Sequence, residues 1–359
     1  MASSEKSMKK MDINRSGRSL VLWLTLLTVP AFAGNPDRAG SAGATQLLIN
    51  PWARSAGMGL ANSARLRGVE GMFGNIAGLA RVRKTEIYFT SSRWLEGSGV
   101  KIQSGAIGQK IGESGVLGIS FTSINYGEVQ VTTVDQPDGG IGSFRPTSGN
   151  IAVAYSKEFS NSIYGGVLVR VASESISNVR ATGFSFDAGI HYVTGPTDNV
   201  HFGIALKNVG PAMRFSGDGM AVQGLLTQGS DQLTIEQRSD RFELPSQMNI
   251  GAAYDWNINE MNRLTVAGNF SSNSFTKDQF TLGLEYGFRK LVYLRGGYTY
   301  EKDITDDKLR QTVFTGPSAG LSVDLAFGKE KASVFSIDYA YRATNPFSGV
   351  HQVGLRLSL

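Results

Sequence analysis

The chain has 359 residues, a formal net charge of +5 and no cysteine. The absence of cysteine excludes a disulfide framework, thiolate chemistry and a lipid anchor on an amino-terminal cysteine. Residues 1–33 hold five of the cations and two of the anions, so the remainder carries only +2 and gives no argument for a nucleic-acid partner.

Residues 1–33 have the composition of a secretory signal peptide. Lysines and arginines precede an apolar run from Leu20 to Val29, and the small-residue site Ala31-Phe32-Ala33 follows it. The run is too short for a membrane-spanning helix. We therefore expect an exported protein whose mature chain begins after Ala33.

The next segment, residues 34–83, differs in composition from the rest of the chain. From Ala44 to Arg83 it is rich in Gly, Ala, Asn and Arg and lacks a sustained two-residue period. A wide barrel has a lumen that needs filling, and an amino-terminal segment is a common filler. We predict that residues 34–83 form a plug.

From residue 84 to residue 359 the chain is a series of amphipathic segments, each about ten residues long, which is the length of a tilted strand that crosses a bilayer. In Gln279–Phe288, large apolar residues alternate with small or polar ones. Such strands satisfy their backbone hydrogen bonds in lipid only by closing on themselves. The fold class predicted is all-β, a transmembrane antiparallel barrel of about fourteen strands; a soluble sandwich or lipocalin-like barrel is the alternative. The strands are expected near 84–94, 99–110, 115–130, 148–159, 162–175, 180–194, 199–208, 245–256, 262–271, 277–288, 291–302, 311–327, 332–343 and 349–359.

The connections differ in length in a regular way. Those after even-numbered strands are all short, whereas 131–147, 209–244 and 303–310 follow odd-numbered strands. Outer-membrane barrels have short periplasmic turns and longer extracellular loops. We therefore expect an outer-membrane protein with both termini in the periplasm.

The longest connection, residues 209–244, combines charged and apolar residues. A loop with this many apolar side chains usually covers something, either the mouth of its own barrel or a partner. We expect it to bind a protein partner. Its candidate contact residues are Met213, Phe215, Met220, Leu225 and Leu226.

A search for catalytic chemistry finds one polar group. Alternation places Asp187, His191 and His201 on the lumen side of two neighbouring strands, and Ser185 lies on the same face. These residues can form a proton-handling or hydrolytic site, or a hydrogen-bonded lumen network of the kind every such barrel contains. There is no metal-ligand spacing, nucleophile elbow or nucleotide loop. We predict no enzyme activity, no metal and no cofactor.

Two stretches of residues 34–83 carry a resemblance to a known family. The first is Ala53-Arg54-Ser55-Ala56-Gly57-Met58-Gly59, which follows Asn50-Pro51-Trp52. The second is Phe73-Gly74-Asn75-Ile76-Ala77-Gly78-Leu79-Ala80, with Ile76 where the family usually has proline. Together they resemble the amino-terminal signature of the PorV/PorQ family, FadL-like outer-membrane barrels of the type IX secretion system.

The resemblance implies a non-enzymatic role in protein secretion, most similar to that of PorV. Its partners would be an outer-membrane translocon and secreted cargo bearing a carboxy-terminal secretion domain. The alternative is a FadL-type transporter of hydrophobic small molecules, which needs an apolar pocket beside the plug and a disruption of the wall, for example at Pro317 or Gly165-Gly166.

Arg54 can pair with a lumen carboxylate such as Asp187, Asp338 or Asp324, and the glycines after it suit a backbone that bends against the inner wall. Whether these residues only anchor the plug or also contact a substrate stays open at this stage. The motif residues singled out are Arg54, Ser55, Gly57, Met58, Gly59, Asn75 and Gly78.

Overall fold

Long antiparallel strands make up most of the structure, a computed structural model that describes residues 38, 40–225, 232–328 and 333–359. The expected signal peptide at 1–33 lies outside the described residues. The long strands are β1 Thr85–Arg93, β2 Lys101–Ile111, β3 Gly115–Asn125, β6 Thr147–Ser160, β7 Ile163–Ile176, β8 Val179–Thr194, β9 Val200–Val209, β14 Gln247–Asn257, β15 Asn262–Asn273, β16 Gln279–Phe288, β17 Val292–Glu301, β18 Phe314–Phe327, β19 Ser333–Thr344 and β20 Val350–Ser358.

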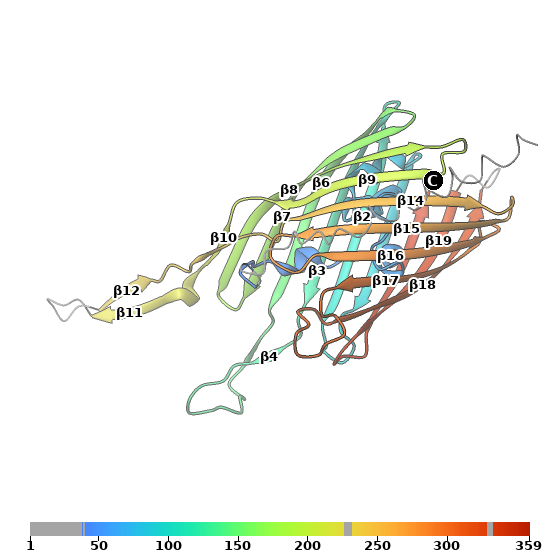
Figure 1. Ribbon diagram of the computed structural model, residues 1–359. Coiled ribbons are helices and arrows are strands. Elements are labelled where there is room, and N and C mark those ends of the chain that lie inside the picture. The colour runs from blue at the N-terminus through green and yellow to red at the C-terminus, as the bar shows by residue number, and fades with distance from the viewer. Residues whose placement is uncertain (1–37, 39, 226–231, 329–332) are drawn as a thin grey trace, which may run out of the picture. The chain divides into compact units, whose positions relative to one another are not determined.

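These strands close into a barrel (Figure 1). Each pairs antiparallel with its neighbour in the chain, β1 pairs with β20, and β9 joins β8 to β14. Two short strands, β10 Met213–Ser216 and β13 Arg241–Phe242, extend the wall beside β8. The predicted fold class is confirmed, because the fourteen remaining strands of the sheet form a closed ring whose backbone needs no partner from solvent.

The predicted strands match the observed ones closely, with the largest difference at the third. That strand was expected to reach residue 130, but β3 ends at Asn125, and β4 Val129–Gln130 is a separate strand that pairs with β5 Ser143–Phe144. The Asn125 side chain accepts a hydrogen bond from the amide of Gly127, which has a φ of 89°. This turn ends the strand, since only glycine enters that backbone region at low cost.

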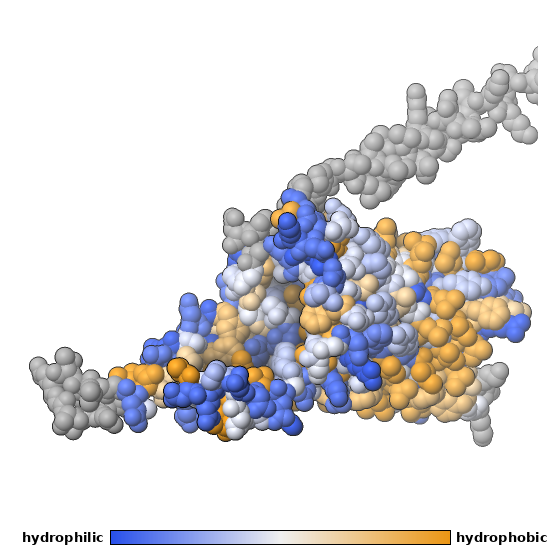
Figure 2. Space-filling view, turned by 90° about the horizontal axis from the view of Figure 1, so that it is seen from below, coloured by the Kyte–Doolittle hydropathy of each residue, from blue (hydrophilic) through white to orange (hydrophobic). Residues whose placement is uncertain are grey.

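The two faces of the wall differ in polarity. On β16, Leu282 and Leu284 point outward, with exposed fractions of 69% and 52%, whereas Thr281 and Glu285 point inward and are buried. Large apolar side chains are exposed in this way on strands around the whole barrel. Figure 2 shows the hydrophobic surface gathered over the barrel and hydrophilic surface over projecting loops. An outward apolar face of this size suits contact with lipid hydrocarbon.

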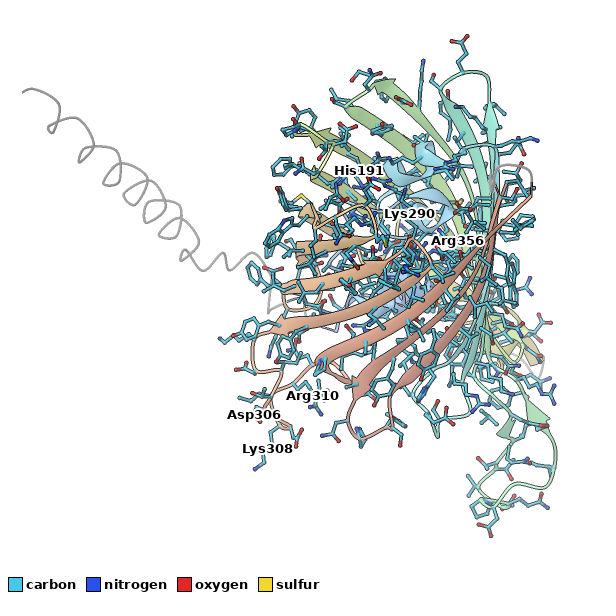
Figure 3. All side chains as sticks on the ribbon, turned by 90° about the vertical axis from the view of Figure 1, so that its right-hand side faces the viewer. His191, Lys290, Asp306, Lys308, Arg310 and Arg356 are labelled. Atoms are coloured by element: carbon cyan, nitrogen blue, oxygen red, sulfur yellow. The ribbon has the colours of Figure 1, made fainter. Side chains whose placement is uncertain are left out.

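The two ends of the barrel differ in the length of their connections. Short turns join β2 to β3, β6 to β7, β8 to β9, β14 to β15, β16 to β17 and β18 to β19, so all of these lie at one end, where β20 also finishes. The β4–β5 hairpin and the hairpin of β11 Ala221–Leu225 and β12 Gln232–Glu236 project from the other end (Figure 1). In the loop between β17 and β18, Asp306, Lys308 and Arg310 lie outside the barrel wall (Figure 3). The predicted asymmetry of the connections is confirmed, and the side of the membrane that each end faces stays a prediction.

Residues 44–82, here called the inner segment, contact inward-facing side chains around the wall. The helices of this segment are η3 Thr45–Leu48, α2 Ala53–Gly57, η4 Gly68–Met72 and η5 Ile76–Arg81. A further short helix, η6 Asp218–Met220, lies in the long loop between β9 and β14. Helix α2 packs on β17–β20, η4 on β1–β3, and η5 on β3 and β6–β8. Among the described residues, no helix is long and apolar enough to cross a membrane.

Glycines of the wall allow this close packing. A Cβ atom at Gly297 would lie 2.4 Å from the carbonyl group of Met58, and one at Gly320 would lie 2.9 Å from the Cα atom of Gly57. Real Cβ atoms do not approach other atoms so closely, so side chains at these wall positions would displace the inner segment.

Candidate functional site

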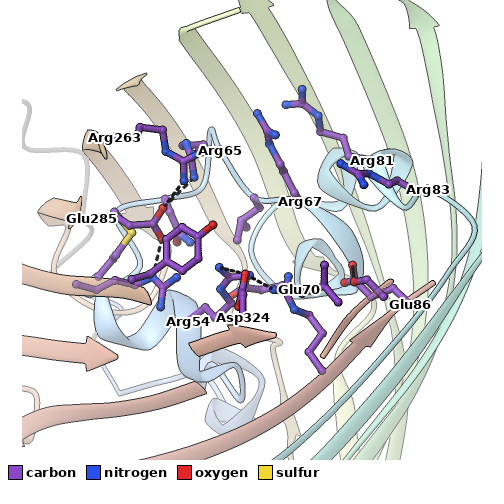
Figure 4. A pocket seen from close by; sticks show the side chains of 18 of the residues that line it. Arg54, Arg65, Arg67, Glu70, Arg81, Arg83, Glu86, Arg263, Glu285 and Asp324 are labelled. Atoms are coloured by element: carbon purple, nitrogen blue, oxygen red, sulfur yellow. Dashed lines mark hydrogen bonds and ion pairs between the residues drawn. The ribbon is translucent and has the colours of Figure 1, made fainter. Parts of the chain in front are cut away.

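Among the cavities formed by the described residues, two lie inside the barrel on opposite sides of the inner segment. The larger, about 460 Å³, reaches the ends of the strands that carry the long loops, and we call it the loop-side cavity. The smaller, about 260 Å³, reaches the ends that carry the short turns, and we call it the turn-side cavity (Figure 4). Asn62 and Leu66 line both cavities. At these two residues, a single layer of the inner segment separates the two spaces.

The loop-side cavity has a mixed lining, in which apolar side chains stand beside polar ones such as Asn249, Gln279 and Glu301. Two of the residues that line it are cations, and each lies over the face of an aromatic ring. Lys207 Nζ is 3.7 Å from the ring centre of Phe73, and Arg342 Cζ is 3.7 Å from the ring centre of Phe314. Small-molecule sites combine apolar and aromatic side chains with placed polar groups, and this cavity contains both kinds. Its apolar lining comes from Leu48, Ile49, Leu60, Leu66, Phe73, Trp94, Leu95, Val313 and Phe314.

The wall is irregular beside this cavity. The pairing of β18 with β19 shifts register between Phe314 and Ser318, where Gly316 has a φ of 111° and Pro317 has no amide hydrogen to donate. The predicted disruption at Pro317 is confirmed. The one predicted at Gly165-Gly166 is wrong, because these residues pair in register with β6 and β8.

A second irregularity was not predicted from the sequence. The pairing of β8 with β9 shifts register between Phe186 and Ala188. The carboxylate of Asp187, at the shift, accepts a hydrogen bond from the backbone amide of Asn208 at 2.7 Å. At a bulge, a backbone amide loses its partner on the neighbouring strand. A buried carboxylate that accepts a hydrogen bond from this amide stabilises the bulge.

The turn-side cavity is built from arginines and carboxylates. Glu285 Oε2 is 2.7 Å from Arg295 Nε, and its Oε1 is 3.0 Å from an Arg263 nitrogen and 3.4 Å from an Arg65 nitrogen. Asp324 lies 3.5 Å from Arg356 and 3.9 Å from Arg54. Since Arg54 and Arg65 belong to the inner segment, these ion pairs fasten it to the wall. Arg65, Glu285 and Arg295 were not predicted from the sequence as site residues; for Glu285 and Arg295, the available signal was a charged residue on the inward face of a strand.

The motif residues of the inner segment contact the wall or one another. Arg54 pairs with Asp338 at 3.6 Å and with Asp324, two of the three carboxylates expected, but not with Asp187. The amide of Ser55 donates to Glu70 at 2.7 Å. Burial raises the pKa of the Glu70 carboxyl above its ordinary value, against the opposing effects of Arg54 and the Ser55 hydroxyl.

The small residues of the motif occupy tight places. Gly59 has a φ of 64°, and a Cβ atom there would lie 3.1 Å from side chains of the wall. A Cβ atom at Gly78 would lie 2.7 Å from the Leu66 carbonyl oxygen. The larger side chain of Met58 is buried among alanines of the inner segment and the wall. These contacts are consistent with an anchoring role for the motif.

Asn75 links the inner segment to two strands. Its side-chain oxygen accepts from the amide of Ala77 and caps η5, while its Nδ2 donates to the carbonyl groups of Ile190 on β8 at 3.2 Å and Ile204 on β9 at 3.3 Å. Ile76, where the family usually has proline, begins η5 directly after this cap. The cap satisfies an amide at the start of the helix, so the local turn needs no proline.

The predicted polar group divides into separate interactions. His191 Nε2 lies 2.7 Å from the carbonyl oxygen of Ser63, and His201 Nε2 lies 3.2 Å from Asp255. Asp187 forms an ion pair with Arg170 at 2.9 Å. Both histidines are fully buried. No hydrogen bond joins Asp187 to a histidine in the part of the chain that the structure describes, and the same residues contain no cluster suited to a metal ion.

The long loop hides part of its apolar surface. Met213 is buried against Ala44, Leu47 and Leu244, and Phe215 packs on the same cluster, so the protein itself covers these two candidate contact residues. Met220 is half-buried. Leu225 ends β11, and Leu226 lies outside the described residues. The hairpin also exposes Val222 and Ile235, two apolar residues outside the set of candidate contact residues.

Comparison with known proteins shows similarity in fold only. No known family profile and no curated protein sequence matches this chain. Among solved structures, the toluene transporter TodX of Pseudomonas putida is 11% identical, with a TM-score of 0.55, over 86% of this chain and 97% of its own. The toluene transporter TbuX of Ralstonia pickettii is 12% identical, with a TM-score of 0.52, over the same shares. The CymD monoaromatic hydrocarbon channel is 13% identical, with a TM-score of 0.51, also over 86% and 97%.

Proposed function

We propose that this protein is an outer-membrane transporter that binds hydrophobic small molecules in the loop-side cavity. The observation that carries the proposal is the position of that cavity: it adjoins the inner segment, part of its lining is apolar, and Phe314 at the β18 register shift lines it. A pocket beside a plug and a disrupted wall are the two features that such a transporter requires. The three solved barrels of similar fold are described as hydrocarbon channels or toluene transporters.

The route follows from this arrangement. A hydrophobic molecule enters from the end with the long loops, binds against Leu48, Ile49 and Phe314, and leaves toward the apolar outside of the wall near the register shift at Phe314 and Ser318. The inner segment acts as the plug, held by Arg54 and Arg65. With the short turns in the periplasm, as in other outer-membrane barrels, both termini face the periplasm.

Uptake of labelled toluene by a Gram-negative host that expresses the protein tests the proposal. We expect an initial rate several-fold above that of the empty vector. Leu48→Asp places a carboxylate in the apolar lining and is expected to remove the gain, whereas Leu309→Asp, on an exposed loop leucine, is the matched control. A rate equal to that of the empty vector, at normal barrel levels, overturns the proposal.

The secretion role implied by the resemblance to the PorV/PorQ family remains a prediction. None of the three similar structures is described as a secretion component. Shortening the loop across Gly217 to Ser239 separates the two roles. Loss of co-purification with a translocon or cargo, with a folded barrel and unchanged toluene uptake, would support a secretion role of the loop in addition to transport.

A further inference from the structure

The turn-side cavity holds more positive than negative charge. Its lining contains eight arginines and four carboxylates. An excess of cations in one cavity is unfavourable, because guanidinium groups face others of their own sign and the buried ones also lose water. The arginines are Arg54, Arg65, Arg67, Arg81, Arg83, Arg263, Arg295 and Arg356, and the carboxylates are Glu70, Glu86, Glu285 and Asp324.

Two of the four carboxylates do not neutralise an arginine of the cavity by direct contact. Glu86 accepts from the amide of Val69 at 2.9 Å and the hydroxyl of Ser358 at 3.0 Å, and Glu70 accepts from Ser55. The other two, Glu285 and Asp324, are each shared by several arginines. Asp338 and Asp255 are further partners of Arg54 and Arg65, so the shortage of acceptors concerns the remaining arginines.

Three of the arginines have no carboxylate partner among the described residues. Arg67 and Arg83 make no ion pair or hydrogen bond there. Arg81 lies over the ring of Tyr164, with its Cζ 4.8 Å from the ring centre, and its Nη1 is buried without a hydrogen bond. The side chain of Arg67 is exposed and lines the cavity (Figure 4).

Buried guanidinium nitrogens without an acceptor are concentrated at this cavity. Besides Arg81 Nη1, they are Arg263 Nε, Arg295 Nη2 and Arg356 Nε. A buried donor without an acceptor costs about 1–3 kcal/mol, more if it is charged. Burial and the charges of Arg81 and Arg65 also lower the pKa of Arg67 to about 9, so it stays cationic at neutral pH in a place that disfavours its charge.

We propose that the turn-side cavity is a binding site for an oxyanion, a phosphate or carboxylate group, with Arg67 and Arg81 as its principal ligands. Planar guanidinium groups bind such anions through paired, charge-assisted hydrogen bonds. A cavity of about 260 Å³ admits a compact anion or the head group of a larger molecule. The site goes beyond the proposed transport function, since it lies on the other side of Asn62 and Leu66 from the loop-side cavity.

Calorimetric titration of the full protein in a non-ionic detergent tests the site. The probes are inorganic phosphate, succinate and dihexanoyl phosphatidic acid, each against sodium chloride of equal ionic strength. We expect saturable binding of phosphate by the wild type. Arg67→Gln with Arg81→Gln is expected to weaken it by about ten-fold or more, because two charge-assisted contacts are lost.

The matched control is Arg289→Gln with Lys290→Gln, which removes the same charge from the exposed turn between β16 and β17, at the same end of the barrel. Lys290 is labelled in Figure 3. The control pair is expected to bind phosphate as the wild type does. Equal weakening in both pairs, or no saturable binding above sodium chloride in the wild type, overturns the proposal.

Phosphatidic acid identifies the source of the anion, and succinate shows whether a carboxylate binds as phosphate does. Binding of phosphatidic acid that is tighter than that of phosphate, and that is lost in the Arg67 and Arg81 variant, assigns the site to a lipid head group; comparable binding assigns it to a soluble anion. Arg67 makes no ion pair, so Arg67→Gln alone leaves the fold intact and serves if the double variant does not fold. Unboiled gel mobility checks the fold of each variant, and unchanged toluene uptake keeps this test independent of the transport function.

Discussion

Glu285→Gln is expected to destabilise the folded barrel by about 3 kcal/mol, at the lower end of the cost of leaving a buried charge unpaired. The side chain of Arg295 is 1% exposed, and Glu285, at 2.7 Å, is its carboxylate partner among the described residues. Arg295 therefore accounts for most of this cost. Arg65 keeps Asp255 at 2.6 Å, and Arg263 is 31% exposed, so water screens its charge. A loss of this size lowers the folding equilibrium constant by about two orders of magnitude.

Urea unfolding in detergent micelles, followed by tryptophan fluorescence, measures the change. Trp52 stacks on Tyr88 at 5.0 Å between ring centres, so its emission reports on the contact of inner segment and wall. The matched control is Glu301→Gln, which changes a buried wall carboxylate whose hydrogen bond comes from Gln279. It is expected to cost about 1 kcal/mol. Equal losses in the two variants would show that the three-arginine contact of Glu285 does not stabilise the barrel.

Three further changes test the wall and the inner segment. Leu282 lies on the outward face near the middle of β16, and Leu282→Arg is expected to destabilise the barrel in lipid vesicles by about 2–4 kcal/mol. Thr281 points inward, so Thr281→Arg should cost less. Equal costs would contradict the assigned faces. Gly297→Val is expected to lower the free energy of unfolding in urea by about 1–3 kcal/mol, because the new Cβ atom meets the inner segment. Gly296 has open space around it, so Gly296→Val is the control and should cost much less. Asn75→Ala removes the cap of η5 and the hydrogen bonds to β8 and β9. We expect the free energy of unfolding to fall by about 1–2 kcal/mol and hydrogen exchange in those strands to become faster. Unchanged exchange would argue against the link between the inner segment and these strands.

The strands and their faces could be predicted from the sequence because alternation is a local property. Each residue of Gln279–Phe288 points to one side or the other according to its position alone, and the apolar residues identify the outward side. The same reasoning placed His191 and His201 inside the barrel, where they are buried. It also gave the difference between the two ends, since loop length is read directly from the spacing of the strands.

The partners of the inward residues depend on tertiary structure. Asp187 and Asp338 both point inward, but only the second lies beside Arg54, because strand register and the path of the inner segment decide which side chains meet. For the same reason the candidate group of Asp187, His191 and His201 divides among Arg170, Ser63 and Asp255.

The two cavities were also decided only by the tertiary structure. Composition shows that residues 44–83 are rich in arginine, but not that Arg67 and Arg81 remain without carboxylates while Arg54 and Arg65 find them. Residues that are far apart in sequence, such as Arg65 and Glu285, come within 3.4 Å only after the strands close into a ring. Alternation along one strand contains no information about that distance, since it depends on the register of every strand pair between them.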